Sequence, residues 1–202
     1  MKSEHYFTKR PTSELKTKTI SILFDSHRCT FETPSGVFSS GDADHASLLL
    51  AKYAIVKENW TVLDLGCGWG LIGILLKKRF PSSAVTASDI NERALAYTKK
   101  NAQSNNISID VYEGSLYEPV KGKKFNTIIT NPPMKAGREV CYQIIEQAKD
   151  HLEKDGMLQL VAAHNRGGKM LEAKMKEVFG NVETSVKKSG LRVYVSLHLR
   201  KE

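Results

Sequence analysis

From residue 61 onward, the chain alternates short apolar runs with longer amphipathic stretches. The runs have the length of buried strands, and the stretches between them have the length and periodicity of helices. We predict strands at 61–65, 84–88, 107–112, 125–130 and 157–162, and helices at 71–80, 92–104, 137–153 and 168–179. Because each predicted strand is almost continuously apolar, the pattern indicates a parallel sheet that helices cover on both faces.

Both ends of the chain follow a different pattern, in which apolar and polar residues alternate. Thr19–Phe24 and Arg28–Thr33 flank a polar turn, which predicts a hairpin, and Asp44 is placed to cap a helix after it. Residues 182–187 and 191–199 flank a Ser-Gly turn and should form an antiparallel hairpin on the parallel sheet.

Together these elements predict one α/β domain with a Rossmann-like, doubly wound, mostly parallel sheet. The C-terminal antiparallel hairpin completes it, and a β-hairpin with a helix precedes it. We therefore divide the chain into an N-terminal extension, residues 1–60, and a main domain, residues 61–202. A length of 202 residues with 41% hydrophobic content suits this single unit and is too short for two full α/β domains.

Composition indicates in which compartment and with which kinds of partner we expect the protein to work. No stretch approaches the length of an apolar membrane span, and the first ten residues lack the apolar core of a signal peptide. The three cysteines lie far apart and have no spacing that suits zinc. We expect a reduced, cytoplasmic protein with no disulfide, no metal and no membrane partner.

The formal net charge of +8 favours an anionic partner. The clusters at 77–79 and 99–100 fall late in predicted helices, where cations complement the helix dipole, so we interpret them as structural. The remaining positive residues near both ends are better candidates for a surface that faces phosphates. They are Lys9, Arg10, Lys16, Lys18, Arg166, Lys169, Lys174, Lys176, Lys187, Lys188, Arg192, Arg200 and Lys201.

A glycine-rich segment, residues 66–73, leads from the first strand of the main domain into a helix, and Asp89 ends the next strand. Glycines let the backbone turn tightly and approach a ligand closely. This strand, glycine loop and helix bind nicotinamide dinucleotides in some proteins and S-adenosylmethionine (SAM) in others. A structural turn without a ligand is a third interpretation. Asp64 favours SAM, because an anion at the mouth would repel a pyrophosphate but tolerate a sulfonium cofactor that carries an ammonium group.

The loop after the fourth strand reads Asn131-Pro132-Pro133-Met134. Its two prolines fix the backbone and remove two N–H donors. The loop should therefore present two rigid acceptors, the side-chain oxygen of Asn131 and the carbonyl of Pro132. Such a pair suits a planar NH₂ group, whose hydrogens it would hold while the nitrogen attacks a methyl group.

These motifs, in this order and spacing, resemble those of class I SAM-dependent methyltransferases that methylate nitrogen. Residues 35–39 (SGVFS) are similar to a segment of the small-subunit rRNA guanine-N2 methyltransferases, with the nearest resemblance to short archaeal relatives that have one catalytic domain. The resemblance covers nearly the whole chain and makes residues 61–202 the SAM-binding catalytic domain.

The resemblance also implies a role for individual residues. Asp89 would bind the ribose, and Met134 stands where the family often has an aromatic residue on the target base. Ser115 stands where an Asp often contacts the adenine. The expected cofactor residues are Asp64, Gly66, Cys67, Gly68, Gly70, Asp89, Ile90, Asn91, Ser115, Leu116 and Asn131. The expected catalytic residues are Asn131, Pro132, Pro133 and Met134, and the candidate substrate contacts are Phe38, His164 and Arg166.

The leading hypothesis is a SAM-dependent N-methyltransferase that modifies an exocyclic amine of rRNA or tRNA, most simply guanine N2. A protein glutamine is an alternative target, because its carboxamide presents similar hydrogens, but the family that methylates glutamine usually has Tyr where Met134 stands. A non-catalytic protein that binds SAM or RNA is a third possibility, against which the intact Asn-Pro-Pro argues.

Overall fold

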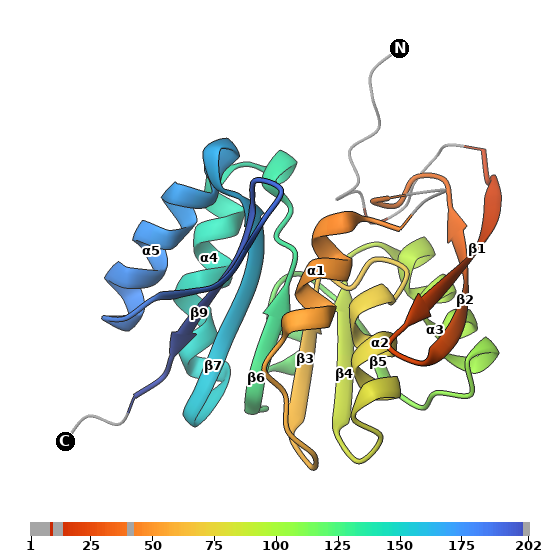
Figure 1. The fold of residues 1–202 in the computed structure, drawn as a ribbon, viewed down its shortest axis with the longest axis horizontal. Coiled ribbons are helices and arrows are strands. Elements are labelled where there is room, and N and C mark those ends of the chain that lie inside the picture. The colour runs from red at the N-terminus through yellow and green to blue at the C-terminus, as the bar shows by residue number, and fades with distance from the viewer. Residues whose placement is uncertain (1–8, 10–13, 40–42, 200–202) are drawn as a thin grey trace.

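The computed structural model describes residues 9, 14–39 and 43–199, and the expected phosphate contacts Arg10, Arg200 and Lys201 lie outside these residues. Seven strands form one sheet in the order β5-β4-β3-β6-β7-β9-β8, and β1 and β2 form a separate hairpin (Figure 1). The strands are β1 Thr17–Phe24, β2 His27–Pro34, β3 Thr61–Leu65, β4 Ala84–Asp89, β5 Asp110–Glu113, β6 Phe125–Thr130, β7 Leu152–Ala163, β8 Glu183–Lys188 and β9 Leu191–Leu197.

The first five strands of the large sheet pair in parallel, and β9 pairs antiparallel with both β7 and β8. This topology confirms the predicted doubly wound sheet with its antiparallel C-terminal hairpin. The α-helices are α1 His45–Tyr53, α2 Leu71–Arg79, α3 Glu92–Ser104, α4 Arg138–Ala148 and α5 Lys169–Phe179. Short turns of other helix types are η1 Glu118–Val120, η2 Met134–Ala136, η3 Lys149–His151 and η4 His164–Gly168.

Side chains of the central strands divide between two hydrophobic layers because successive residues of a strand face opposite sides. Val62 joins the layer under α1 and α2, whereas Leu63 and Leu65 join the layer under α4 and α5. All three are at most 4% exposed. The same alternation turns Asp64 toward α2, and this decides its environment in the candidate site.

Three predicted boundaries are wrong by several residues. The helix predicted over 137–153 ends at Ala148, and β7 begins at Leu152 rather than Met157. Leu152 pairs with Phe125, the register then shifts, and the pairing resumes between Met157 and Thr127. The apolar run from Met157 therefore predicts only the later part of the strand. The strand predicted over 107–112 is confined to β5, because its first three residues lie outside the ladder.

The β1–β2 hairpin is anchored to α3 by two asparagine side chains that pair with its backbone. Asn101 accepts a hydrogen bond from the N–H of Glu32 at 2.7 Å and donates to the Glu32 carbonyl at 3.0 Å. Asn105 makes the same pair of bonds with Thr30, at 3.0 and 2.7 Å. Each carboxamide thus takes the place of a neighbouring strand, and Figure 1 shows the hairpin alongside α3.

Helix α1 is attached to the sheet in a similar way. The side chain of Gln159 in β7 accepts from the N–H of Ile55 at 2.9 Å and donates to its carbonyl at 2.7 Å. Leu50 is fully buried in the layer that also contains Val62. Residues before and after the predicted division at 60/61 therefore share one hydrophobic core. No helix in the described part of the chain is long and apolar enough to cross a membrane.

Replacing Asn101 by Ala should destabilise the fold, because it removes both bonds to Glu32 and the bond to the carbonyl of Trp69, and leaves partly buried backbone groups without these partners. We expect the free energy of unfolding to fall by about 2 kcal/mol, measured by urea denaturation. The exposed Gln103, two residues along the same helix, provides the control, and Gln103→Ala should stay close to the parent protein. Equal stabilities of the two variants would contradict this view of the hairpin.

Candidate active site

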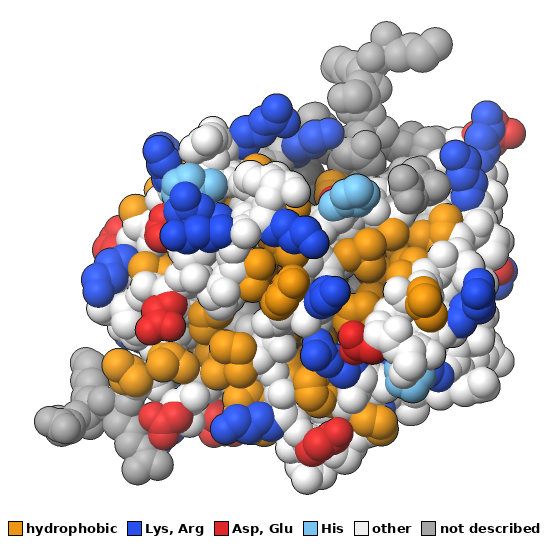
Figure 2. All heavy atoms as spheres, in the orientation of Figure 1, with side chains coloured by type: hydrophobic (Ala, Val, Ile, Leu, Met, Phe, Trp, Pro, Cys, Tyr) orange, Lys and Arg blue, Asp and Glu red, His pale blue; other side chains and the backbone are white. Residues whose placement is uncertain are grey.

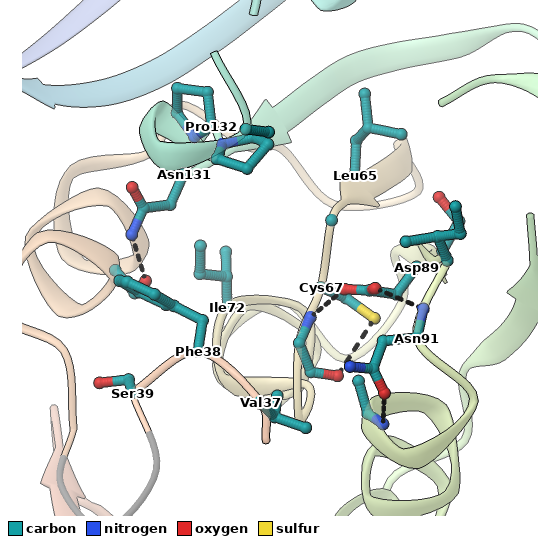
Figure 3. A pocket seen from close by; sticks show the side chains of 18 of the residues that line it. Val37, Phe38, Ser39, Leu65, Cys67, Ile72, Asp89, Asn91, Asn131 and Pro132 are labelled. Carbon is teal, nitrogen blue, oxygen red and sulfur yellow. Dashed lines mark hydrogen bonds between the residues drawn. The ribbon is translucent and has the colours of Figure 1, made fainter. Parts of the chain in front are cut away.

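One cavity of about 400 Å³ opens at the carboxyl ends of β3, β4 and β6, where α1 and the glycine-rich segment meet the Asn-Pro-Pro loop (Figure 3). Its size is in the range of small-ligand sites, and its wall is mostly apolar with a few polar groups. The wall includes thirteen of the predicted residues as well as several that were not predicted. The predicted residues outside the Asn-Pro-Pro loop that line the cavity are Phe38, Gly66, Cys67, Gly68, Asp89, Ile90, Asn91, Ser115 and Leu116. The loop itself contributes Asn131, Pro132, Pro133 and Met134.

The glycine-rich segment is held open by the end of β4. The N–H groups of Gly66 and Cys67 both donate to the carbonyl of Ser88, at 2.8 and 3.0 Å. Gly66 and Gly68 have φ angles of 72° and 57°, and a Cβ added to Gly66 would meet nothing within 4 Å. The backbone therefore presents an open surface to the cavity, as the sequence pattern predicted for a loop that approaches a ligand closely.

Asp89 connects this loop to the start of α3. Its carboxylate accepts from the N–H of Gly68 at 2.8 Å and from the N–H of Asn91 at 2.9 Å, as Figure 3 shows. Burial raises the pKa of Asp89, and the backbone hydrogen bonds from Asn91 and Gly68 oppose that shift. Ile90 is a third backbone donor to this carboxylate, and its two oxygens together have about four acceptor sites, so Asp89 can still accept from a hydroxyl group in the cavity.

The turn at residues 114–116 forms the neighbouring part of the wall. Gly114 donates to the carbonyl of Asp89 at 3.1 Å, which fixes the turn to the end of β4. Leu116 has a φ of 48°, a left-handed conformation that costs a branched side chain energy and is found most often at ligand sites. The turn places Ser115 and Leu116 at the cavity together with Ile90.

The Asn-Pro-Pro loop forms the opposite wall. The side-chain nitrogen of Asn131 donates to Asp44 at 2.8 Å and to Ser47 at 3.0 Å, while its Oδ1 accepts no hydrogen bond from any described residue. The carbonyl of Pro132 accepts from the N–H of Met134 at 2.8 Å, which occupies one of its two lone pairs. One lone pair of that carbonyl and the whole of Asn131 Oδ1 thus stay available as acceptors.

The two apolar residues that are candidates to contact the target base, Phe38 and Met134, both line the cavity. Phe38 is 47% exposed, and its carbonyl accepts from the indole N–H of Trp69 at 3.2 Å. Met134 lies against Gly167, where any side chain would overlap the Met134 methyl group. An exposed ring and a thioether therefore both line the cavity together with Asn131, and both stay candidates for contacts to a base.

Asp64 and Gly70 do not line the cavity, although both were predicted to belong to the cofactor site. Asp64 is 1% exposed and accepts from the N–H of Gly73 at 2.8 Å, so its carboxyl group lies under the loop and not at the mouth. The expected discrimination against pyrophosphate by a charge at the mouth therefore has no basis in this geometry. Gly70 is needed for a close approach instead, because a Cβ there would lie 2.9 Å from Thr98 in α3.

His164 and Arg166 are also absent from the cavity wall. Nδ1 of His164 forms a hydrogen bond of 2.7 Å with the hydroxyl of the buried Tyr194. This bond holds the ring of His164 against β9. Burial, and then the charges of Arg192 and Lys169, lower the pKa of His164. These two candidates lie on a separate basic surface, which meets the cavity only where Gly167 contacts Met134.

Asp44, Ser47 and Trp69 line the cavity but were not predicted as site residues. The sequence identified Asp44 as a helix cap, and the structure confirms that role with a 2.8 Å bond from the N–H of Ser47. Its second bond, to Asn131, joins residues 87 positions apart, and no local pattern indicates such a contact.

The cysteines have no sign of nucleophilic or metal chemistry. Burial raises the pKa of Cys67 well above its usual value, and Asp89 and Asp64 add to the shift, so the thiol stays protonated. Burial likewise raises the pKa of Cys141 to about 11. Within the part of the chain that the structure describes, no cluster of three or more His, Cys, Asp or Glu side chains could hold a metal ion.

Comparison with known proteins gives a match to a family model, a relative of similar length and relatives that are much longer. A family model described as "Methyltransferase small domain" matches residues 28–195. The uncharacterized protein YbxB of Bacillus subtilis is 34% identical over 191 residues, which are 93% of this chain and 95% of that protein. Because this relative, matched along nearly its full length, is bacterial, the expected resemblance to short archaeal proteins is not supported.

The named relatives are longer than this chain. Ribosomal RNA small subunit methyltransferase C of Haemophilus influenzae is 39% identical over 131 residues, which are 63% of this chain and only 39% of that protein. Among solved structures, the 16S rRNA N2 methyltransferase RsmC of T. thermophilus, in complex with AdoMet and guanosine, has a TM-score of 0.79. It is 24% identical, and the match covers 94% of this chain and 52% of that one, which establishes a shared fold.

The buried carboxyl group of Asp64 should make stability depend on pH. Burial raises its pKa from 3.8 to about 7, against the effect of the hydrogen bond from Gly73, and Asp89 raises it further. The folded protein therefore holds a proton that the unfolded chain has lost, and the free energy of unfolding falls as the pH rises from about 4 to about 7. The contribution of Asp64 to stability is greatest below about pH 4 and is lost above about pH 7.

Asp64→Asn should abolish that part of the pH dependence, because an amide keeps the acceptor for Gly73 and does not ionise. Relative to the parent protein, the variant should gain stability across this range, by up to about 4 kcal/mol at about 1.4 kcal/mol per pKa unit. Urea denaturation at a series of pH values measures the difference. Parallel pH profiles for the two proteins would contradict the assignment.

Proposed function

The chain belongs to the methyltransferase small domain family, and we propose that this SAM-dependent methyltransferase acts on the exocyclic N2 amine of a guanine in ribosomal RNA. The observation that carries the proposal is the pair of rigid acceptors, Asn131 Oδ1 and the Pro132 carbonyl, beside a cavity with an open glycine loop. A transfer RNA is the second possible carrier of the same amine. With either RNA, the enzyme would work in the cytoplasm.

The residues of the cavity fit SAM. Gly66 and Gly68 leave room for the methionine part, Asp89 retains acceptors for the two ribose hydroxyls, and Ile90 and Leu116 supply apolar surface for the adenine. When bound, SAM supplies an electrophilic methyl group: the amine nitrogen gains the N–CH₃ bond, sulfur keeps the electrons of the broken bond, and the nitrogen then loses a proton to water.

The acceptors would hold the target amine in the plane that the reaction needs. An exocyclic amine is a weak nucleophile because its lone pair is delocalised into the ring, so positioning has to supply most of the rate enhancement. Asn131 Oδ1 and the Pro132 carbonyl would each accept one N–H, which directs the remaining lone pair toward the methyl group. The same two oxygens stabilise the positive charge that develops on nitrogen.

A basic surface beside the cavity supports an RNA substrate. It consists of five cations at the ends of β7, β8 and β9, and none of them forms an ion pair with an acidic side chain within the described ranges. Figure 2 shows Lys and Arg side chains along the upper margin of the molecule, above the ends of β7 and β9. The five are Arg166, Lys169, Lys187, Lys188 and Arg192.

Two of the other candidate cations are already engaged in the structure. Lys174 binds Glu146 and Glu177 at 2.6 and 2.8 Å, and Lys176 donates to the carbonyl of Gly180. A Lys or Arg that no acidic side chain neutralises is better able to neutralise a phosphate and so release the counterions condensed on the RNA. The basic surface therefore holds the better candidates, and the contact between Gly167 and Met134 joins it to the catalytic loop.

Incubating the protein with labelled SAM and small-subunit RNA from cells that lack the enzyme should give labelled N2-methylguanosine, identified by mass spectrometry of the nucleosides. Asn131→Ala should lower kcat by about 100-fold, which is the usual effect of losing one oriented polar group in an active site. Label that appears only in protein would instead indicate the glutamine alternative and overturn the proposal.

The basic surface can be tested separately. Replacing both Lys187 and Lys188 by Ala should raise KM for RNA about three- to tenfold and lower its salt dependence, because each lost phosphate contact weakens binding and reduces the salt slope. Affinity for SAM, measured by calorimetry, should not change. Lys154→Ala, an exposed cation at the start of β7, is the matched control. An unchanged KM in the double variant would exclude this surface from RNA binding.

A further inference from the structure

One carboxylate oxygen in the N-terminal part of the chain accepts two hydrogen bonds that serve different purposes. Asp44 Oδ2 accepts from the N–H of Ser47 at 2.8 Å, which caps α1, and from Nδ2 of Asn131 at 2.8 Å. Ser47 Oγ lies 3.0 Å from the same Nδ2 and accepts its second hydrogen. Both hydrogens of the Asn131 amide are therefore held by the first turn of α1, and Figure 3 shows this amide nitrogen directed at the helix.

These contacts leave the amide of Asn131 with one orientation. Rotating it by half a turn would put its oxygen against the carboxylate of Asp44, where two acceptors would repel one another without a proton between them. It would also leave Ser47 facing the oxygen and turn the NH₂ group away from both partners. Oδ1 is consequently the atom that stays available to a substrate amine.

The charge of Asp44 adds an electrostatic effect to the orientation. A carboxylate bonded to the NH₂ side of an amide polarises it and increases the negative charge on its oxygen, as in other hydrogen-bonded chains. An oxygen that is more negative stabilises the positive charge on a nitrogen during methyl transfer more strongly. The effect is stronger here than it would be in water, because the wall of the site is mostly apolar.

We propose that Asp44 and Ser47 are positioning residues for methyl transfer, which act by orienting and polarising the carboxamide of Asn131. They do so from the N-terminal extension, outside the strands and loops that form the rest of the catalytic centre. The inference rests on the proposed methylation of an amine, because only a target with N–H groups needs an oriented acceptor at this place.

Four variants separate orientation, charge and helix stability. Asp44→Ser keeps a good helix cap but cannot reach Asn131, Ser47→Ala removes the second acceptor, and Asp44→Asn keeps an oxygen at the cap while it removes the charge. Lys52→Ala, in the exposed last turn of α1, is the control for a general weakening of the helix. Thermal unfolding of each variant shows whether the fold is retained.

The expected losses appear in kcat for RNA methylation. Asp44→Ser should lose about 100-fold and Ser47→Ala about tenfold, since a bond to a charged group is worth more than a neutral one. Asp44→Asn should fall between Asp44→Ser and the parent protein, and Lys52→Ala should match the parent. KM for RNA and the Kd for SAM should stay within twofold. A kcat within threefold of the parent in both Asp44→Ser and Ser47→Ala would overturn the inference.

A second measurement does not depend on activity. The side-chain ¹⁵N–¹H₂ resonance of Asn131 can be assigned by its loss in Asn131→Ala, and the exchange of its hydrogens with water can be followed by NMR. We expect slow exchange in the parent and in Lys52→Ala, and about tenfold faster exchange in Asp44→Ser and Ser47→Ala, as one lost hydrogen bond implies. Unchanged exchange in both would show that α1 does not hold the amide.

The two readouts distinguish a failure of the inference from a failure of the proposed function. If the parent protein methylates guanine but the variants do as well, the positioning role is wrong and the function stands. If the parent labels a protein glutamine instead, the function is wrong. The NMR measurement then still decides whether Asp44 and Ser47 orient Asn131.

Discussion

The site depends on the parallel pairing of β3 with β4 on one side and β6 on the other. Parallel strands bring their carboxyl ends to one edge of a sheet, so the glycine loop, Asp89 and the Asn-Pro-Pro loop converge although they are far apart in the sequence. The carbonyl of Ser88 fixes the distance between two of these segments because it accepts from both Gly66 and Cys67. The glycine loop is thus held in place by the end of a neighbouring strand, and the Asn-Pro-Pro loop by the start of α1.

The residues before β3 complete this arrangement, and side chains of α3 and β7 attach them by pairing with their backbone. Asn101, Asn105 and Gln159 each present a carboxamide, which has the same donor and acceptor as a peptide unit, to a segment of the first sixty residues. Such pairs attach the hairpin and α1 to the main sheet without extending it. The attachment brings Phe38 and Asp44 to the cavity, so the N-terminal residues form part of its wall.

Patterns within a few residues of one another were enough to predict most of the fold. The bounds of β6, the cap of α3 at Asn91 and the glycine turn all follow from local sequence, and the structure has them as predicted. Side-chain direction was harder to predict. Asp64 stands next to the glycine loop in sequence, but strand alternation turns it toward α2, and the link between Asp44 and Asn131 depends on how α1 packs against the sheet.

If Asp44 orients Asn131 as we propose, its double role makes catalytic competence depend on a local opening of the chain. Helix α1 has only nine residues, and the ends of short helices fray far more readily than whole domains unfold. If its first turn opens, Asn131 loses the partners that fix its amide, even though the sheet and the glycine loop stay folded. The free energy of that one turn, and not the global stability of the protein, then sets the fraction of molecules that can act.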